Sequence, residues 1–162
     1  VAFDVGRVIS FYYWGIGRGF GFRDTSQDTI AVTISNPEKA KERIHLLARQ
    51  MFIDGSVYHH FYDDGQGEKT GHCDDPLWFL LAVTDYIKET GDFEILNKME
   101  PFVDGNSDTI LNHMFSVINF VKINLGKHGL PIFGRGDWND TLDYIGGNGG
   151  GGGAGYVSII IS

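Results

Sequence analysis

Two carboxylates flank an indole in the stretch GRGDWND at residues 134–140. A turn needs only Gly and Asn to reverse the chain, so Asp137, Trp138 and Asp140 require another explanation. An indole face stacks on the apolar face of a pyranose, and an acid beside such a wall can have its pKa raised enough to donate a proton. The pattern predicts acid catalysis at a glycosidic oxygen. An Asn-Asp turn with a structural tryptophan is the alternative.

A second polar group occupies residues 21–28, GFRDTSQD, with charged and amide side chains at Arg23, Asp24, Gln27 and Asp28. These residues fit the start of a helix that Thr25 or Ser26 caps, with acids in its first turn. Arg23 would then form an ordinary ion pair. The same composition suits a sugar site, because carboxylates and guanidinium groups grip vicinal hydroxyls through paired hydrogen bonds.

The segment HHFYDDGQGEKTGHCDD, residues 59–75, contains the residue types that bind metals: His59, His60, His72, Cys73 and four aspartates. It lacks the C-x-x-C or H-x-x-x-H spacing of a metal site, and neighbouring side chains in a chain point apart. We therefore predict a solvated acidic loop that ends at a helix N-cap, Asp75, and no metal.

Alternating glycines from Gly15 to Gly21 suggest a phosphate-binding loop, but the G-x-G-x-x-G pattern needs a glycine at Phe20 or Phe22. The segment also opens no long helix inside a βαβ unit, so nucleotide binding is not expected. The first 22 residues, rich in aromatic and β-branched residues and glycine, are predicted to be strand and loop.

The composition excludes several classes of protein. The 162 residues, 42% of them hydrophobic, are enough for one domain with a core. The net charge of −8 argues against nucleic acid or an anionic membrane as a partner. No apolar run reaches the length of a membrane span, and the amino terminus has no signal-peptide layout. The single cysteine, Cys73, fits the reducing conditions of a cytoplasmic location. The start at Val1 and the glycine-rich end suggest a fragment of a longer chain.

Hydrophobic periodicity predicts three main helices. The first opens at Pro37 and buries a face at Ala40, Ile44, Leu47, Ala48 and Met51. The second is capped by Asp75 and stops at Gly91, and the third runs from about Asp108 to Gly126. A shorter helix is expected at 26–35 and a turn or two at 93–102. The expected core includes Ile44, Leu47, Leu80, Leu81, Met114 and Ile118.

After residue 23 the pattern is helix after helix, with no strand between helices. Loops between these helices hold the residues suited to chemistry. This arrangement favours an all-α fold whose loops gather at one end, as they do in helical barrels.

Five stretches, in this order, resemble the inverting glycoside phosphorylases of glycoside hydrolase family 94: YYWGIGRGFGFRDTSQD, IDGSVYHHFY, DDPLWFLLAVTDYIKETGDFEIL, LGKHGLPIFGRGDWND and TLDYIGG. They cover most of the chain from residue 12 to residue 147. The stretch FDVGR at residues 3–7 is similar to the family's F-N-W-S-R.

The resemblance implies a fold and a reaction. The fold is an (α/α)6 barrel, of which residues 1–147 would form about half, followed by an atypical glycine-rich tail at 148–162. The reaction is the attack of inorganic phosphate on a β-glycosidic disaccharide or oligosaccharide, which releases an α-sugar 1-phosphate. Phosphate is a co-substrate, and no cofactor is required. The resemblance is also compatible with a longer parent protein that forms a homodimer.

The resemblance also assigns roles to residues. Asp140 would be the general acid and Trp138 the wall beside the sugar whose bond is broken. Arg18 and Asp24 would hold that sugar, with Arg18 also near the phosphate, and Arg7 would contact the substrate. Further phosphate-binding and acceptor-site residues of the family lie beyond residue 162, so this chain alone is not expected to be active.

Two other functions remain open. An inverting hydrolase on the same helical barrel would need a second carboxylate to activate water across the sugar ring. A non-catalytic helical module that binds carbohydrate would need no such group.

Overall fold

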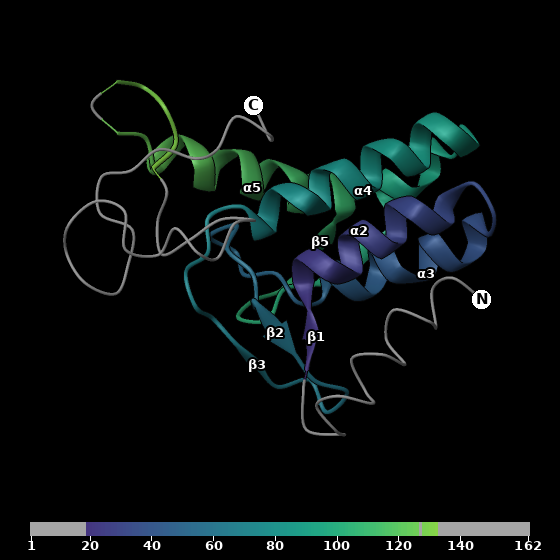
Figure 1. Cartoon of the computed structure of the whole chain (residues 1–162), viewed down its shortest axis with the longest axis horizontal. Coiled ribbons are helices and arrows are strands. Elements are labelled where there is room, and N and C mark those ends of the chain that lie inside the picture. The colour runs from purple at the N-terminus through teal and green to yellow at the C-terminus, as the bar shows by residue number, and fades with distance from the viewer. Residues whose placement is uncertain (1–18, 127, 133–162) are drawn as a thin grey trace.

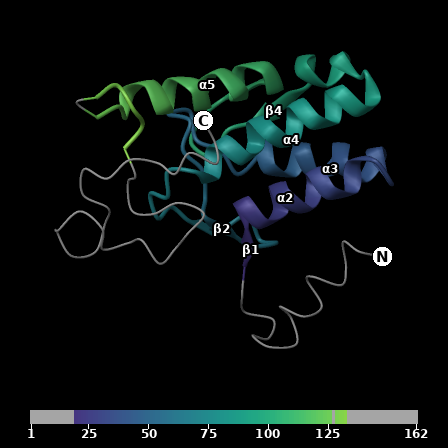
Figure 2. The same cartoon turned by 45° about the horizontal axis from the view of Figure 1, so that its top comes forward.

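The computed structural model describes residues 19–126 and 128–132. In this part of the chain the helices are α2 (Phe22–Thr33), α3 (Pro37–Ala48), α4 (Asp75–Thr90) and α5 (Ile110–Ile123), with a short 3-10 helix η1 (Phe93–Asn97). Helix α4 lies between α5 and the pair formed by α2 and α3 (Figures 1 and 2). The prediction of an all-α fold is confirmed in part, because the described region is rich in helix but also contains short strands. None of the described helices combines the length and apolar character that crossing a bilayer requires.

Short strands interrupt the helices, so the expectation of helix after helix beyond residue 23 is wrong. Strands β1 (Phe20–Gly21), β2 (His60–Phe61) and β3 (Gly67–Glu68) form an antiparallel sheet in that order. Strands β4 (Met99–Pro101) and β5 (Ser107–Thr109) pair with each other. Strands of two or three residues are too short to show an alternating hydrophobic pattern, which is why the sequence concealed them.

Helix α2 begins earlier than the predicted residue 26. The backbone N–H of Phe22 donates to the carbonyl of His59 at 2.9 Å, where β1 pairs with β2, and the Phe22 side chain is fully buried. The N-cap position is Gly21, without a side-chain cap, so the predicted caps at Thr25 or Ser26 are wrong. Tertiary contacts around Phe22 therefore define where this helix starts.

Helix α3 confirms its predicted start and its buried face. The Asn36 side chain accepts a hydrogen bond from the Lys39 backbone N–H at 3.1 Å, and Pro37 occupies the first turn. The helix ends at Ala48 and not at Met51, which instead bridges to Val57 and is buried there.

Helix α4 ends as predicted but is capped differently. Gly91 adopts a left-handed conformation, with φ of 70°, that favours glycine. Asp75 is the first helical residue and not the N-cap, which is Asp74. Neither carboxylate caps the helix, because both bind partners from other elements.

The last predicted helix is shorter than expected. Residues from Asp108 to Thr109 belong to β5, and the Thr109 side chain caps α5 by accepting the N–H of Asn112 at 3.2 Å. The helix ends at Ile123. The turn expected at 93–102 is η1, followed by β4.

The core lies between the helices, and two of its predicted members are wrong. Ile44 and Leu47 are fully buried, and Leu80 and Met114 pack against the core from its edge. Leu81 and Ile118 are each 37% exposed. Successive helical residues are about 100° apart. Because α4 buries Phe79 and Val83, Leu81 faces away from the core, and Ile118 is turned away from the buried Val117 in the same way.

This difference in burial predicts a difference in stability. Leu47→Ala should lower the free energy of unfolding by about 2–5 kcal/mol, because it leaves a cavity in the core. Leu81→Ala removes the same atoms from a partly exposed site and should cost about 1 kcal/mol or less. Urea denaturation of the two variants measures both values. Equal losses would mean that Leu81 is buried in the protein in solution.

Candidate functional site

Of the residues predicted to bind or cleave a sugar, Asp24 lies in the described structure. It occupies the first turn of α2 and is exposed. A Cβ atom on Gly21 would lie 2.5 Å from Oδ2 of Asp24, so the carboxylate folds back over the glycine that precedes the helix. Arg7, Arg18, Trp138 and Asp140 lie outside the described residues, as does Asp137.

Arg23, unlike its exposed neighbour Asp24, is buried. Its guanidinium is buried, and Nη1 donates to Oδ2 of Asp74 at 3.0 Å. The indole N–H of Trp78 donates to the same oxygen at 3.1 Å. The predicted ion pair of Arg23 is therefore confirmed, and it joins the first turn of α2 to the start of α4.

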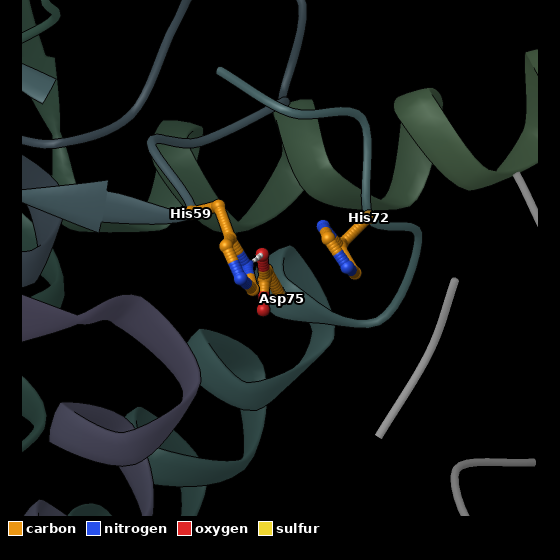
Figure 3. A group of neighbouring side chains, drawn as sticks. All are labelled: His59, His72 and Asp75. Carbon is orange, nitrogen blue, oxygen red and sulfur yellow. Dashed lines mark hydrogen bonds and ion pairs between the residues drawn. The ribbon is translucent and has the colours of Figure 1, made fainter. Parts of the chain in front are cut away.

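The next residue, Asp75, binds a different element. Its Oδ2 accepts a hydrogen bond from Nδ1 of His59 at 2.7 Å, and the His59 residue immediately precedes β2. Figure 3 shows the His59 ring against the carboxylate of Asp75, with His72 on the loop that leads into α4. Two consecutive carboxylates thus tie α4 to α2 and to the β1–β2 sheet.

Burial dominates the electrostatics of this pair. Removal from water raises the pKa of Asp74 above its usual value, although Arg23 and Trp78 oppose the shift. Burial likewise raises the pKa of Asp75, and His59 opposes it. In each carboxylate Oδ1 is buried and has no hydrogen-bond partner in the described part of the chain. Groups so enclosed can hold neighbouring elements in place.

His59, His72 and Asp75 are a candidate metal site, because one ligand atom of each lies within 4.8 Å of the others. The geometry argues against a preformed site. The two imidazole rings stack at 3.9 Å with only 10° between their planes, so their lone pairs run side by side instead of converging on one ion. In addition, Nδ1 of His59 is engaged by Asp75 and Nδ1 of His72 is hydrogen-bonded to Thr70 at 2.6 Å.

Sequence reasoning missed the cluster around Asp74 and Asp75. The partners Arg23 and Asp74 are 51 positions apart, and His59 and Asp75 are 16 apart. Local spacing carries no signal for such pairs. The visible hint was the double aspartate before Pro76, of which Asp75 was predicted to be an N-cap.

A separate groove of about 420 Å³ lies along α5. Its lining includes Phe102, Phe115, Asn119 and Ile123, together with Asp54. None of the residues lining this groove belongs to α2 or to the loop at 59–75, so the groove is separate from Asp24 and from the cluster around Asp74 and Asp75.

Comparison with known proteins identifies the family. A family model described as the glycosyl hydrolase 94 superfamily, catalytic domain, matches residues 1–161. The chain belongs to this superfamily. This finding confirms the resemblance drawn from the five sequence stretches. The match includes the predicted site residues that lie outside the described structure.

The relatives of this glycosyl hydrolase 94 chain include enzymes named as phosphorylases and one named as a synthase. Over 83% of the chain it is 34% identical to a solabiose phosphorylase of Paenibacillus borealis, and over 87% it is 30% identical to an N,N'-diacetylchitobiose phosphorylase of Vibrio furnissii. It is also 31% identical, over 85% of its length, to a cyclic beta-(1,2)-glucan synthase of Rhizobium meliloti. The matched regions are 17%, 21% and 6% of those three proteins. The matched region is thus about a fifth of the two phosphorylases and a much smaller part of the synthase.

The stacked geometry of His59 and His72 predicts that the glycosyl hydrolase 94 chain needs no metal. Neither EDTA nor an excess of Zn²⁺ should shift its melting temperature, because an ion that bound the native state would stabilise it. Differential scanning fluorimetry measures the shift, with His72→Ala as the matched control. A rise on adding Zn²⁺ that disappears in His72→Ala would show that the rings turn to bind the ion.

Proposed function

We propose that the full-length gene product containing this chain is an inverting glycoside phosphorylase. Phosphate attacks the anomeric carbon of a β-glycosidic disaccharide or oligosaccharide, the bond to the leaving-group oxygen breaks, and an α-sugar 1-phosphate forms. The match of the superfamily's catalytic domain to residues 1–161 carries the proposal, and two of the relatives named above are phosphorylases. The substrate class is a β-linked sugar.

One carboxylic acid suffices for this reaction. In the proposal Asp140 donates its proton to the departing oxygen, and phosphate takes the place of the water that a hydrolase would activate with a second carboxylate. Trp138 lies against the sugar whose bond breaks. The roles of these two residues rest on the resemblance of GRGDWND to the family's sequences, within the region that the family model matches.

The remaining roles concern binding. Arg18 and Asp24 hold the sugar, Arg18 also contacts phosphate, and Arg7 contacts the substrate. The exposure of Asp24 in the first turn of α2 supports its part, because a carboxylate that binds a sugar hydroxyl has to be accessible. Arg23, whose charge is already paired with Asp74, is not assigned to the sugar.

The barrel fold, the co-substrate and the cellular compartment are also proposals. Residues 1–147 would form part of an (α/α)6 barrel, with 148–162 as a tail. The helix-rich described region supports a place in such a barrel. Phosphate is the proposed co-substrate, with no metal or organic cofactor, and the cytoplasm stays the predicted compartment.

A second candidate function is chain synthesis, which the similarity to the cyclic beta-(1,2)-glucan synthase favours. In that case the domain would act on a growing β-glucan inside a larger enzyme. The product of the reaction distinguishes the two: a phosphorylase releases a sugar 1-phosphate, whereas a synthase lengthens a glucan.

Phosphate should be obligatory for cleavage by the full-length gene product. Incubation with cellobiose, N,N'-diacetylchitobiose or solabiose should yield an α-sugar 1-phosphate for at least one of them, and no cleavage when phosphate is omitted. Proton and phosphorus NMR identify the product and its anomeric configuration. Free sugars formed without phosphate would indicate a hydrolase, and binding without turnover would indicate a carbohydrate-binding module.

Asp140→Asn in the full-length gene product should lower turnover in both directions by about two to four orders of magnitude, the usual contribution of general acid catalysis. Sugar binding should change little. The loss should be much smaller for an aryl glycoside whose leaving group needs no proton. Asp137→Asn is the matched control and should have a milder effect, since that residue is assigned to loop geometry. An indispensable Asp137 with a dispensable Asp140 would reverse the two roles.

A further inference from the structure

The start of α2 is held by partners outside the helix. Its N-cap, Gly21, offers no side chain to the first turn. The two residues that follow are instead anchored from elsewhere: the N–H of Phe22 donates to the backbone carbonyl of His59 at 2.9 Å, and Arg23 donates to Asp74 at 3.0 Å. The next residue is Asp24.

The two anchors lead to two consecutive carboxylates, Asp74 and Asp75. Arg23 contacts Asp74 directly, and His59, whose carbonyl holds Phe22, donates from its ring to Asp75 at 2.7 Å. Asp74 and Asp75 are 0% and 1% exposed and begin α4. The residues on the amino-terminal side of Asp24 are therefore fixed to the rigid start of another helix.

Asp74 is itself held in one orientation. Its Oδ2 receives hydrogen bonds from Arg23 and from Trp78, one turn further along α4. The surrounding chain leaves it no exposure to solvent. Loss of its charge would leave the buried guanidinium of Arg23 without its partner in this pair, which favours displacement of the first turn of α2 toward water.

We propose that Asp74 is a positioning residue of the sugar site, acting through Arg23 to set the place and orientation of Asp24. The inference rests on the proposed function, in which Asp24 holds the sugar whose bond breaks. Asp75 and His59 support the same turn through Phe22. Asp74 touches neither sugar nor phosphate in this arrangement, and its effect on the reaction is indirect.

The test compares two buried, ion-paired carboxylates in the full-length gene product. Asp74→Asn keeps the shape of the side chain and removes its charge. Glu100→Gln is the matched control, because Glu100 is 6% exposed and pairs with Arg49 and His45, neither of which belongs to α2. Both variants should be less stable to heat. The substrate is whichever of cellobiose, N,N'-diacetylchitobiose and solabiose the wild type cleaves with phosphate.

Asp74→Asn should lower kcat/KM by about 3- to 30-fold, chiefly through a higher KM, while Glu100→Gln leaves both constants near the wild-type values. The decisive readout is the double variant with Asp24→Asn. If Asp74 acts through Asp24, Asp74→Asn should cause no further loss of kcat/KM in the Asp24→Asn background. If Asp74→Asn does not fold, Trp78→Phe replaces it, since this change removes the indole N–H that donates to the same oxygen and keeps the Arg23 contact.

Several outcomes would overturn the proposal. An unchanged KM in Asp74→Asn, an equal change in Glu100→Gln, or full additivity with Asp24→Asn would each make Asp74 a purely structural residue. A wild-type protein that cleaves none of the three sugars in the presence of phosphate would overturn the proposed function, and the positioning role would fall with it. The activity of the wild type therefore separates the two failures.

Discussion

The buried ion pair between Arg23 and Asp74 constrains how the two central helices meet. An unpaired guanidinium or carboxylate would be costly at this depth, so the first turn of α2 and the start of α4 have to stay in contact for either helix to be buried. The neighbouring pair of His59 and Asp75 extends the constraint to the small sheet beneath α2. Helices and sheet are thus joined at one point by four charged or titratable side chains.

Elements set by local chemistry were predictable from the sequence. Asn36 and Pro37 start α3 and Gly91 ends α4, because capping and left-handed glycine depend on adjacent residues only. The start of α4 was missed by one residue. Asp74 and Asp75 have the same side chain, and only their distant partners determine that neither acts as a cap.

In the candidate site, too, local features could be predicted from the sequence and distant contacts could not. Asp24 could be selected from the order of family motifs, and an ion pair of Arg23 was foreseen as an ordinary property of a helix start. Asp74 could not be predicted as the partner of Arg23, because 51 residues separate the two and no periodic pattern connects them. The stacked rings of His59 and His72 were hidden for a related reason: a hairpin brings together residues whose spacing is typical of no metal site.

The contrast between Arg23 and Asp24 follows from helix geometry. Consecutive residues on a helix point about 100° apart, so one can face the interior while the next faces solvent. Arg23 uses its long side chain to reach Asp74 inside the protein, and Asp24 keeps its carboxylate at the surface above Gly21. The free-energy cost of burying charge therefore falls on Arg23 and not on Asp24. Because the two residues are consecutive in one helix, anchoring Arg23 also restricts where the backbone of Asp24 can lie. A helix start can in this way present a polar group accurately without enclosing it.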